Sequence, residues 1–403
     1  MKKKLLLVIS ALVCTVTMWA ETGYTFKAVA LNVDGLPEEI SGVSVNKGAP
    51  AETGATAICN YLATCGWDIV AMSEDFDYHN YIAAAPASNF YNFGTWRGAI
   101  DLGVGDILLK NSADTDGLGL ALAKYLTYSG ENIVAWGNYN GYTDQGADGL
   151  IDKGYRSYQV KFGEGAYVNV FILHMDADSN DADITARETQ LGKLATAIKT
   201  LMASNKYPTI VLGDTNCRYT RENLKSKFID VINADSRFTI KDAWVELVRD
   251  GVYPTYGSDA LMTWELGLQK GEVVDKIFYI NTTESDLTLK ANSYLQDGRL
   301  TVSDHYPVVV SFTLTDPDGT PVDNTLSGAD DEVVLTDGTP TDPTSDLSGV
   351  YYLRNVSTGK YLNMGGQHST HAYESVHVLP VTLSKVGTNT YSVQSHTLGD
   401  VYP

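Results

Sequence analysis

The stretch Thr301-Val-Ser-Asp-His-Tyr-Pro-Val-Val-Val-Ser-Phe312 places a polar triplet, Ser303-Asp304-His305, directly before a β-branched run that is typical of a buried strand. Burying an acid and an imidazole beside an apolar strand costs free energy unless a partner, a metal ion or a reaction uses them. The alternative is a polar turn that merely holds Asp304 and His305 before a core strand. The rest of the chain helps to choose between these interpretations.

Polar side chains recur at the ends of other predicted strands. The sequence predicts strands over 24–33, 67–73, 157–161, 167–173, 209–213 and 273–280, and helices over 51–64, 185–202 and 241–247. In an α/β architecture, ligands collect at one end of a sheet. The polar residues found at these ends are Asn32, Asp34, Glu74, His174, Asp214, Asn216, Asp275, Asp304 and His305.

The histidine distribution favours a functional interpretation of this set. The region 21–315 contains only three histidines, His79, His174 and His305, and two of them lie at strand ends. A single carboxylate at a strand end carries little information. Polar side chains at the ends of several predicted strands in one region are not expected by chance. The sequence therefore predicts that these residues meet around one cavity.

The same segments resemble the endonuclease/exonuclease/phosphatase superfamily, which includes DNase I-like nucleases, inositol polyphosphate 5-phosphatases and neutral sphingomyelinases. The resemblance covers residues 24–315, and it implies an α/β fold, the DNase I-like four-layer α/β/β/α sandwich. One departure is Ser73, where the family commonly has Gln before the metal-binding Glu. The matching motifs are Leu31-Asn-Val-Asp-Gly-Leu-Pro37, Asp68-Ile-Val-Ala-Met-Ser-Glu74, Leu173-His174, Val211-Leu-Gly-Asp-Thr-Asn216, Val274-Asp-Lys-Ile-Phe-Tyr279 and Ser303-Asp-His-Tyr-Pro307.

The residue types indicate a site for a hard divalent cation. Carboxylate and amide oxygens suit Mg²⁺, with Mn²⁺ and Ca²⁺ open as alternatives. Glu74 is the first expected ligand, with Asp304 and with Asn32 or Asp34 nearby. Zinc is disfavoured, because the cysteines do not accompany the histidines.

The remaining members of the set suit hydrolysis by an activated water molecule. We expect His305 to act as the general base and Asp275 to fix its tautomer. We expect Asp214 and Asn216 to orient the nucleophile and the phosphate, and His174 to neutralise charge on the phosphoryl oxygens.

Four other polar residues carry weaker expectations. Arg187 is expected to bridge its helix to the sheet rather than to serve the reaction. Lys153 and Arg156 are either phosphate contacts or a solvated pair. His79 is either part of the pocket or a hydrogen-bonded loop residue.

Charge and motifs together predict a metal-dependent phosphoric ester hydrolase, most specifically a phosphodiesterase acting on a small molecule or a lipid headgroup. The formal charge of −20 disfavours a long polyanion, because nonspecific nucleic-acid affinity rests on Lys and Arg. A DNase I-like endonuclease is the alternative. A non-catalytic glycan-binding surface protein is the second alternative, and it is motivated by the C-terminal region.

Composition changes along the chain predict four parts, and we expect the protein to be a monomer. Residues 1–20 have the charged start and apolar run of a signal peptide, so we expect a secreted, periplasmic or surface-exposed protein. Residues 21–315 form the predicted catalytic domain, and the acidic segment 316–346 reads as a linker. For residues 347–403 the sequence predicts a small β module, which partly resembles one ricin-type β-trefoil repeat. We expect this module to be able to contact glycan. Cys59 and Cys65 are expected to be buried thiols, although a disulfide between them stays open.

Overall fold

The structure is a computed structural model, and it describes most of residues 23–315 and part of the C-terminal region. The predicted signal peptide at 1–20 and the predicted linker at 316–346 lie outside the described residues. The described residues are 23–36, 39–40, 43–44, 52–98, 115–136, 153–261, 271–300, 302–315, 348–351, 361–364, 372–375, 381–387 and 390–395.

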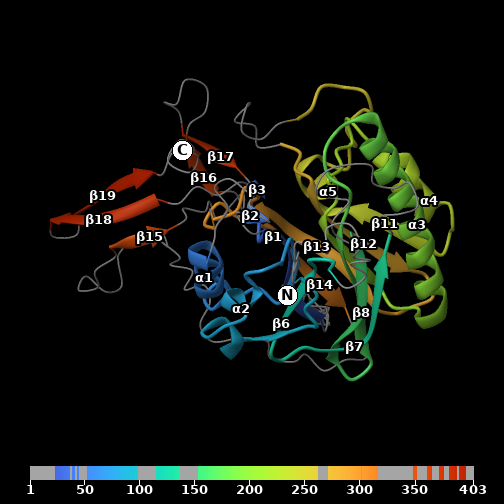
Figure 1. Ribbon diagram of the computed structural model, residues 1–403, viewed down its shortest axis with the longest axis horizontal. Helices are drawn as coiled ribbons and strands as arrows, with labels where there is room; N and C mark the ends of the chain where they lie inside the picture. The colour runs from blue at the N-terminus through green and yellow to red at the C-terminus, as the bar shows by residue number, and fades with distance from the viewer. Residues whose placement is uncertain are drawn as a thin grey trace, which may run out of the picture.

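Two mixed six-stranded sheets form the body of the molecule (Figure 1). The first sheet has the order β13-β14-β1-β4-β6-β5, and the second has the order β11-β12-β10-β9-β8-β7. The pairs β1–β4 and β9–β10 are parallel, and the other pairs are antiparallel. The strands of the first sheet are β1 (Gly23–Asn32), β4 (Ile69–Ser73), β5 (Tyr91–Phe93), β6 (Gly119–Ala123), β13 (Thr288–Gln296) and β14 (Val308–Thr315). Those of the second are β7 (Thr127–Ala135), β8 (Gly154–Gly163), β9 (Ala166–His174), β10 (Thr209–Asp214), β11 (Phe238–Asp242) and β12 (Asp275–Thr282).

Side-chain alternation in β1 explains why the two sheets stack. Ala28 and Ala30 belong to the large core that includes the second sheet, whereas Val29 and Leu31 belong to the core beneath α1 (Glu52–Leu62). Successive residues of a strand point to opposite faces, so a strand that is apolar throughout must be covered on both sides. The four-layer α/β/β/α arrangement that the motifs implied is therefore present.

Helices cover the outer faces of both sheets. The short α2 (His79–Ile82) packs near α1, and the 25-residue α3 (Asp181–Asn205) lies with α4 (Asp230–Asn233) on the other side of the molecule (Figure 1). The described helices include none that is long and apolar enough to cross a membrane. Helix α3 begins at a capping box, in which Asn180 accepts from the Asp183 backbone and the Asp183 side chain accepts from the Asn180 backbone. Short helical turns also occur at Ala87–Asn89 and Lys225–Ile229.

One predicted helix is wrong in its first turn. Residues Phe238–Asp242 form the edge strand β11, and α5 begins only at Ala243 and ends at Val248. Asp242 ends the strand and caps the helix, because its Oδ1 accepts from Trp244 N at 2.8 Å and Val245 N at 3.3 Å. Strands β6 and β13 were not predicted. Small residues in β6 and a bulge between Ala291 and Ser293 in β13 weaken the period-two signal.

Short strands are also described outside the two main sheets. In the C-terminal region, β15 (Gly349–Tyr351), β18 (Val381–Gly387) and β19 (Thr390–Ser395) form one sheet, and β16 (Tyr361–Met364) pairs with β17 (Ala372–Ser375). Strands β2 (Glu39–Ile40) and β3 (Val43–Ser44) form a further pair. A β-rich C-terminal segment is thus present, while the trefoil resemblance remains a prediction.

The cysteines are buried thiols. Cys59, Cys65 and Cys217 are all free and buried, so no disulfide joins Cys59 to Cys65. Burial raises the pKa of the Cys65 thiol to about 12. The sandwich therefore rests on its apolar core rather than on cross-links.

Candidate active site

The predicted site residues converge where the central strands of both sheets end. In the second sheet, Asp214 of β10 is the direct cross-strand neighbour of His174 in β9 and of Asp275 in β12. In the first sheet, Asn32 pairs with Ser73, which directly precedes Glu74. Strand register therefore brings together residues that lie far apart in the sequence.

Close backbone packing fixes the turns that follow these strands. Glu74 is in the left-handed region with φ 57°, and its carbonyl accepts from Gly35 N at 3.0 Å. A Cβ on Gly35 would lie 2.4 Å from that carbonyl oxygen, so only glycine fits there. Gly213, before Asp214, has φ 140°, and a Cβ there would lie 2.1 Å from Leu173 O.

The Asn32 amide links two carboxylates from different sheets. Its Nδ2 donates to Glu74 Oε1 at 3.0 Å and to Asp214 Oδ2 at 3.1 Å, and Asn32 is fully buried. Its Oδ1 accepts from the backbone N–H of Asp34 at 2.9 Å. Asn32 thus holds Glu74 and Asp214 together, and its predicted role as a metal ligand remains a prediction.

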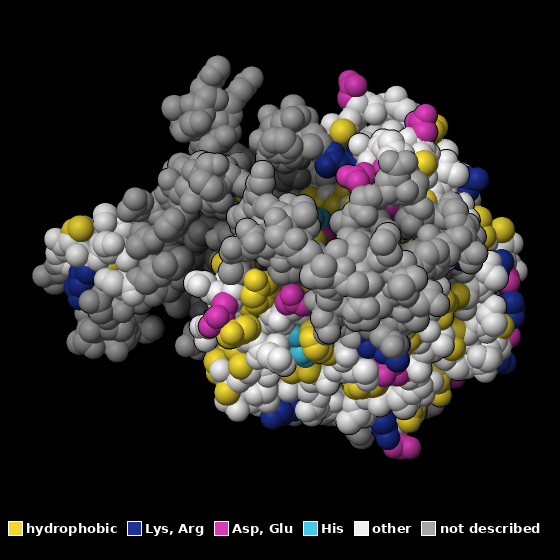
Figure 2. All heavy atoms as spheres, viewed as in Figure 1, with side chains coloured by type: hydrophobic (Ala, Val, Ile, Leu, Met, Phe, Trp, Pro, Cys, Tyr) yellow, Lys and Arg dark blue, Asp and Glu magenta, His cyan; other side chains and the backbone are white. Residues whose placement is uncertain are grey.

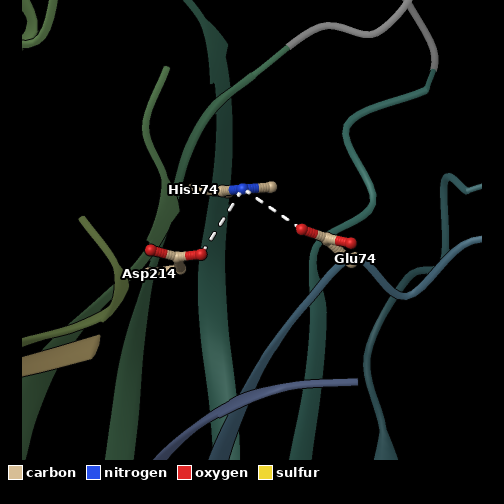
Figure 3. Close-up of side chains that lie close together, drawn as sticks. All are labelled: Glu74, His174 and Asp214. Atoms are coloured by element: carbon tan, nitrogen blue, oxygen red, sulfur yellow. Dashed lines mark ion pairs between the residues drawn. The ribbon is translucent and has the colours of Figure 1, made fainter. Parts of the chain in front are cut away.

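His174 lies between the same two carboxylates (Figure 3). Its Nε2 is 3.8 Å from Glu74 Oε1 and 3.7 Å from Asp214 Oδ2, and the ring is almost completely buried. Only the Glu74 side chain of this cluster is partly exposed, at 21%. The cluster therefore opens to solvent on the side of Glu74.

His305 and Asp275 form a close pair on the other side of Asp214. His305 Nδ1 is 2.6 Å from Asp275 Oδ2, while His305 Nε2 is 4.0 Å from Asp214 Oδ2. A hydrogen bond at Nδ1 leaves Nε2 as the atom that faces a reactant. Asp275 is buried, and its second oxygen has no hydrogen-bond partner among the described residues.

Burial and charge shift the pKa values of these groups in opposite directions. Burial raises the pKa of Glu74 to about 7, and burial also raises the pKa of Asp275. Burial acts in the same sense on Asp214, but the charges of His305 and His174 hold its pKa below the ordinary value. For His305, burial opposes the charged form, yet Asp275 and Asp214 raise its pKa well above the ordinary value.

The donor set fits a divalent cation. Two groups of side chains, Glu74 with His174 and Asp214, and Asp214 with Asp275 and His305, present ligand atoms within 4.8 Å of one another. Burial is the main cause of the raised pKa of Glu74, and the neighbouring Asp214 carboxylate adds to it, so a bound cation would stabilise the charged form of both acids. Hard oxygen donors with few nitrogens favour Mg²⁺, Mn²⁺ or Ca²⁺, and the geometry does not choose among them.

Three predicted site residues lie further from the centre. Asp304 is exposed at 73% and belongs to neither group, although its Oδ1 is 3.9 Å from His305 Nε2. Asp34 is partly exposed and has φ 48°. Asn216 also has φ 48°, its N–H donates to Asp214 Oδ1 at 2.8 Å, and its Nδ2 donates to Met175 O at 3.1 Å. In this structure, Asn216 supports Asp214, and a direct contact with phosphate remains a prediction.

Two of the weaker expectations concern arginines, and both residues are buried. Arg187 donates to Glu222 and to the Asp176 and Ala177 carbonyls, as expected for a bridging residue. Arg156 is neither a solvated residue nor a phosphate contact, because it is fully buried and paired with Asp116.

Lys153 and His79 have different surroundings. Lys153 is also buried; its charge opposes the rise in the pKa of Glu74 that burial causes and helps to hold the pKa of Asp214 down, so it contributes positive charge beside the site. His79 is hydrogen-bonded to Asp75 at 2.7 Å.

Sequence reasoning did not find Trp96, whose Nε1 donates to the Asp75 carbonyl at 2.7 Å, because no strand end or motif marks it.

On the face of the molecule that Figure 2 shows, the described residues form no single charged patch. On the face in Figure 2, acidic and basic side chains of the described residues are interspersed with hydrophobic ones.

Comparison with known proteins gives similarity only at the level of structure. No family model and no curated protein matches the sequence. Truncated TDP2 from Caenorhabditis elegans is 14% identical, with a TM-score of 0.45, over 72% of this chain and 98% of that chain. The human Nocturnin catalytic domain with bound sulfate anion is 15% identical, with a TM-score of 0.46, over 72% and 95%. Beta toxin from Staphylococcus aureus is 16% identical, with a TM-score of 0.45, over 71% and 99%.

The identification of the fold rests on the chain itself. Two stacked mixed sheets with helices on their outer faces carry the expected motifs at the ends of β1, β4, β9 and β10, at the start of β12 and just before β14. The chain therefore has a DNase I-like α/β/β/α sandwich fold.

Proposed function

We propose that this protein is an exported, divalent-cation-dependent phosphodiesterase that hydrolyses its substrate by direct attack of water. The observation that carries the proposal is the pairing of His305 with Asp275 at 2.6 Å, facing the Asp214, Asn32 and Glu74 group. A buried acid that orients a histidine is the arrangement that general-base catalysis requires. Export is supported by the Lys-rich start and apolar run of residues 1–20.

The nucleophilic water fits between His305 and Asp214. The 4.0 Å separation of His305 Nε2 and Asp214 Oδ2 lets one water molecule hydrogen-bond to both atoms, at about 2.8 Å from each. His305 accepts a proton from this water as the water oxygen attacks phosphorus; the bond from phosphorus to the leaving oxygen breaks, its electron pair stays on that oxygen, and the product leaves as an alcohol after taking a proton from solvent. Asp275 stabilises the imidazolium that results, and Asp214 keeps the water in line with the bond that breaks.

Away from the His305–Asp275 pair, near Glu74 and Asp214, positively charged groups are available to stabilise the phosphoryl oxygens. Glu74 and Asp214 would hold the cation, which when bound supplies Lewis-acid stabilisation of the charge on phosphorus-bound oxygens. His174, between Glu74 and Asp214, is placed to donate from its ring to a phosphoryl oxygen. Lys153 adds a second cationic group next to the same carboxylates.

A small or lipid-headgroup phosphodiester is the substrate class that we favour. Tight nonspecific binding of a long polyanion requires many Lys and Arg contacts, and the chain has 29 Lys and Arg against 49 Asp and Glu. The motif that contains Asn32 and Asp34 also resembles the nuclease branch, so DNA is the competing substrate. Rates of hydrolysis of a lipid-headgroup phosphodiester and of DNA, measured under the same conditions, distinguish the two substrate classes.

The decisive experiment measures turnover of a chromogenic phosphodiester in Mg²⁺, Mn²⁺, Ca²⁺ and EDTA. We expect cation-dependent turnover that His305→Ala reduces by about 10²- to 10⁴-fold. His377→Ala, in the predicted C-terminal module, is the matched control and should be as active as the wild type. Equal rates for wild type and His305→Ala, or no turnover by either, would favour the non-catalytic glycan-binding alternative.

The substrate class is tested separately. Sphingomyelin and plasmid DNA are compared at matched Mg²⁺ and low salt. Faster hydrolysis of DNA than of sphingomyelin and of the chromogenic ester would replace the headgroup assignment with the endonuclease.

A further inference from the structure

The main-chain groups that flank the Glu74 side chain are held on every side. Glu74 O accepts from Gly35 N at 3.0 Å and from Phe76 N at 2.9 Å. Asp75 N donates to Gly117 O at 2.8 Å, and Asp75 O accepts from Trp96 Nε1 at 2.7 Å. The left-handed φ of 57° at Glu74 is unfavourable for a residue with a Cβ, so these contacts must maintain it.

An aromatic and acidic network lies directly behind this turn. The buried carboxylate of Asp75 is 2.7 Å from His79 Nδ1, and His79 stacks on Trp96 with a centroid distance of 5.1 Å and an interplanar angle of 13°. Phe93 packs edge-on against the same imidazole at 6.0 Å. His79 is therefore held both by its hydrogen bond and by two rings, and it in turn fixes Asp75.

The packing around this network leaves no room for it to shift. A Cβ on Gly98 would lie 2.1 Å from Asp75 O and 2.5 Å from Trp96 Nε1. A Cβ on Gly119 would lie 2.3 Å from Asp75 Oδ2. The backbone of two separate segments thus closes around Asp75, and a displacement of Asp75 would pass directly to its neighbour Glu74.

We propose that Asp75, His79 and Trp96 are positioning residues that set the Glu74 carboxylate for cation binding. The inference rests on the proposed function, because it assigns these residues a role in the affinity of that site. None of the three needs to touch substrate or cation. They act by holding the left-handed turn, so that Glu74 Oε1 stays within reach of Asn32 Nδ2 and His174 Nε2. Outer partners of metal ligands influence affinity in this way in many proteins.

The test measures Mn²⁺ affinity by titration calorimetry, with thermal unfolding measured in parallel. Trp96→Phe keeps an aromatic ring to stack on His79 but deletes the donor to Asp75 O. His79→Ala deletes the partner of Asp75. We expect each variant to bind Mn²⁺ about 10- to 100-fold more weakly than the wild type. His79→Gln, which can restore a donor to Asp75, should recover part of the loss.

Asp68→Asn is the matched control, because Asp68 is a buried acid just before the opposite end of β4. It accepts from Lys27 N at 2.6 Å and from Tyr125 OH at 2.9 Å. Its replacement should lower the unfolding temperature but leave Mn²⁺ affinity unchanged. This control separates a general loss of stability from a specific loss of positioning.

The possible outcomes distinguish the two proposals. Absence of Mn²⁺ binding by the wild type would overturn both the cation site and the positioning role. Binding that Glu74→Gln abolishes, but that Trp96→Phe and the His79 variants leave at wild-type affinity, would overturn the positioning role alone. Equal weakening by Asp68→Asn would also overturn it. If His79→Ala does not fold, the result for Trp96→Phe decides.

Discussion

Replacing Asp275 by Asn should disable the histidine while leaving the fold in place. Asp275 is 3% exposed, and its Oδ2 is 2.6 Å from His305 Nδ1. Asn has the same shape but carries no charge, so it cannot stabilise the imidazolium that forms when His305 takes a proton. It can also present its amide N–H₂ to Nδ1, which favours the wrong tautomer.

The expected decrease in kcat follows from the two functions that are lost with the Asp275 carboxylate, which are to stabilise the imidazolium and to fix the tautomer of His305. General-base assistance contributes about 10²- to 10⁴-fold to rate, and most of it depends on a correctly oriented neutral imidazole. We therefore expect kcat to fall by roughly 10³-fold, which corresponds to about 4 kcal/mol in activation free energy. Burial already raises the pKa of Asp275, so an uncharged replacement removes an unfavourable buried charge. The free energy of unfolding should consequently change little.

The pH dependence gives an independent readout of the same change. Asp275 raises the pKa of His305, and only the neutral ring can accept a proton. Without the carboxylate, the pKa of His305 falls, so the acidic limb of the kcat/KM profile should move to lower pH in Asp275→Asn. The assay is turnover of a chromogenic phosphodiester between pH 5 and pH 9 at saturating Mg²⁺.

A second acid supplies the control for Asp275→Asn. Asp235 forms a surface pair with Arg237 at 2.8 Å, and Asp235→Asn should leave both kcat and its pH profile unchanged. Wild-type kcat in Asp275→Asn, or an acidic limb that stays in place while kcat falls, would refute the assignment of His305 as the general base oriented by Asp275.

Three further predictions test the cation site and the packing around it. Burial raises the pKa of Glu74 from the ordinary 4.5 to about 7, so in the metal-free protein its contribution to stability is present below about pH 4.5 and is lost as pH rises through 7. Added Mn²⁺ should therefore raise the unfolding temperature more at pH 8 than at pH 5, and an equal rise at both would contradict a role for Glu74 as ligand. Gly213→Ala places a Cβ 2.1 Å from Leu173 O and should lower the free energy of unfolding by at least about 2 kcal/mol in urea titrations; a loss below 0.5 kcal/mol would show that the strands adjust. Arg187→Ala removes the fully buried partner of Glu222 and leaves the partly exposed Arg221 as its remaining ion-pair partner, so it should lower the free energy of unfolding by about 3 kcal/mol, with kcat retained in the folded fraction; a selective loss of kcat without destabilisation would place Arg187 in the reaction instead.

Much of the fold was predictable because apolar runs carry strong local signals. The central strands β1, β4, β9, β10, β12 and β14 are fully or largely buried, and their hydrophobic runs were recognised directly. The edge and outer elements were harder. Strand β11 exposes alternate residues, and β13 contains a bulge, so neither gives an uninterrupted pattern.

For the candidate site, too, one part could be predicted from the sequence and another part could not. The sequence by itself determined which residue types stand at the strand ends, because a polar side chain directly after a buried run must be used or be costly. It thereby marked Asn32, Glu74, His174, Asp214 and His305 before any geometry was known.

Only the tertiary structure decided which of those residues lie next to one another, and therefore which role each can take. Register between strands makes Asp214 the neighbour of both His174 and Asp275, and the two sheets together bring Asn32 against Glu74 and Asp214. It also placed Asp304 at the exposed rim and Trp96 behind the turn at Glu74. Such contacts depend on long-range packing, which a local pattern of residues does not encode.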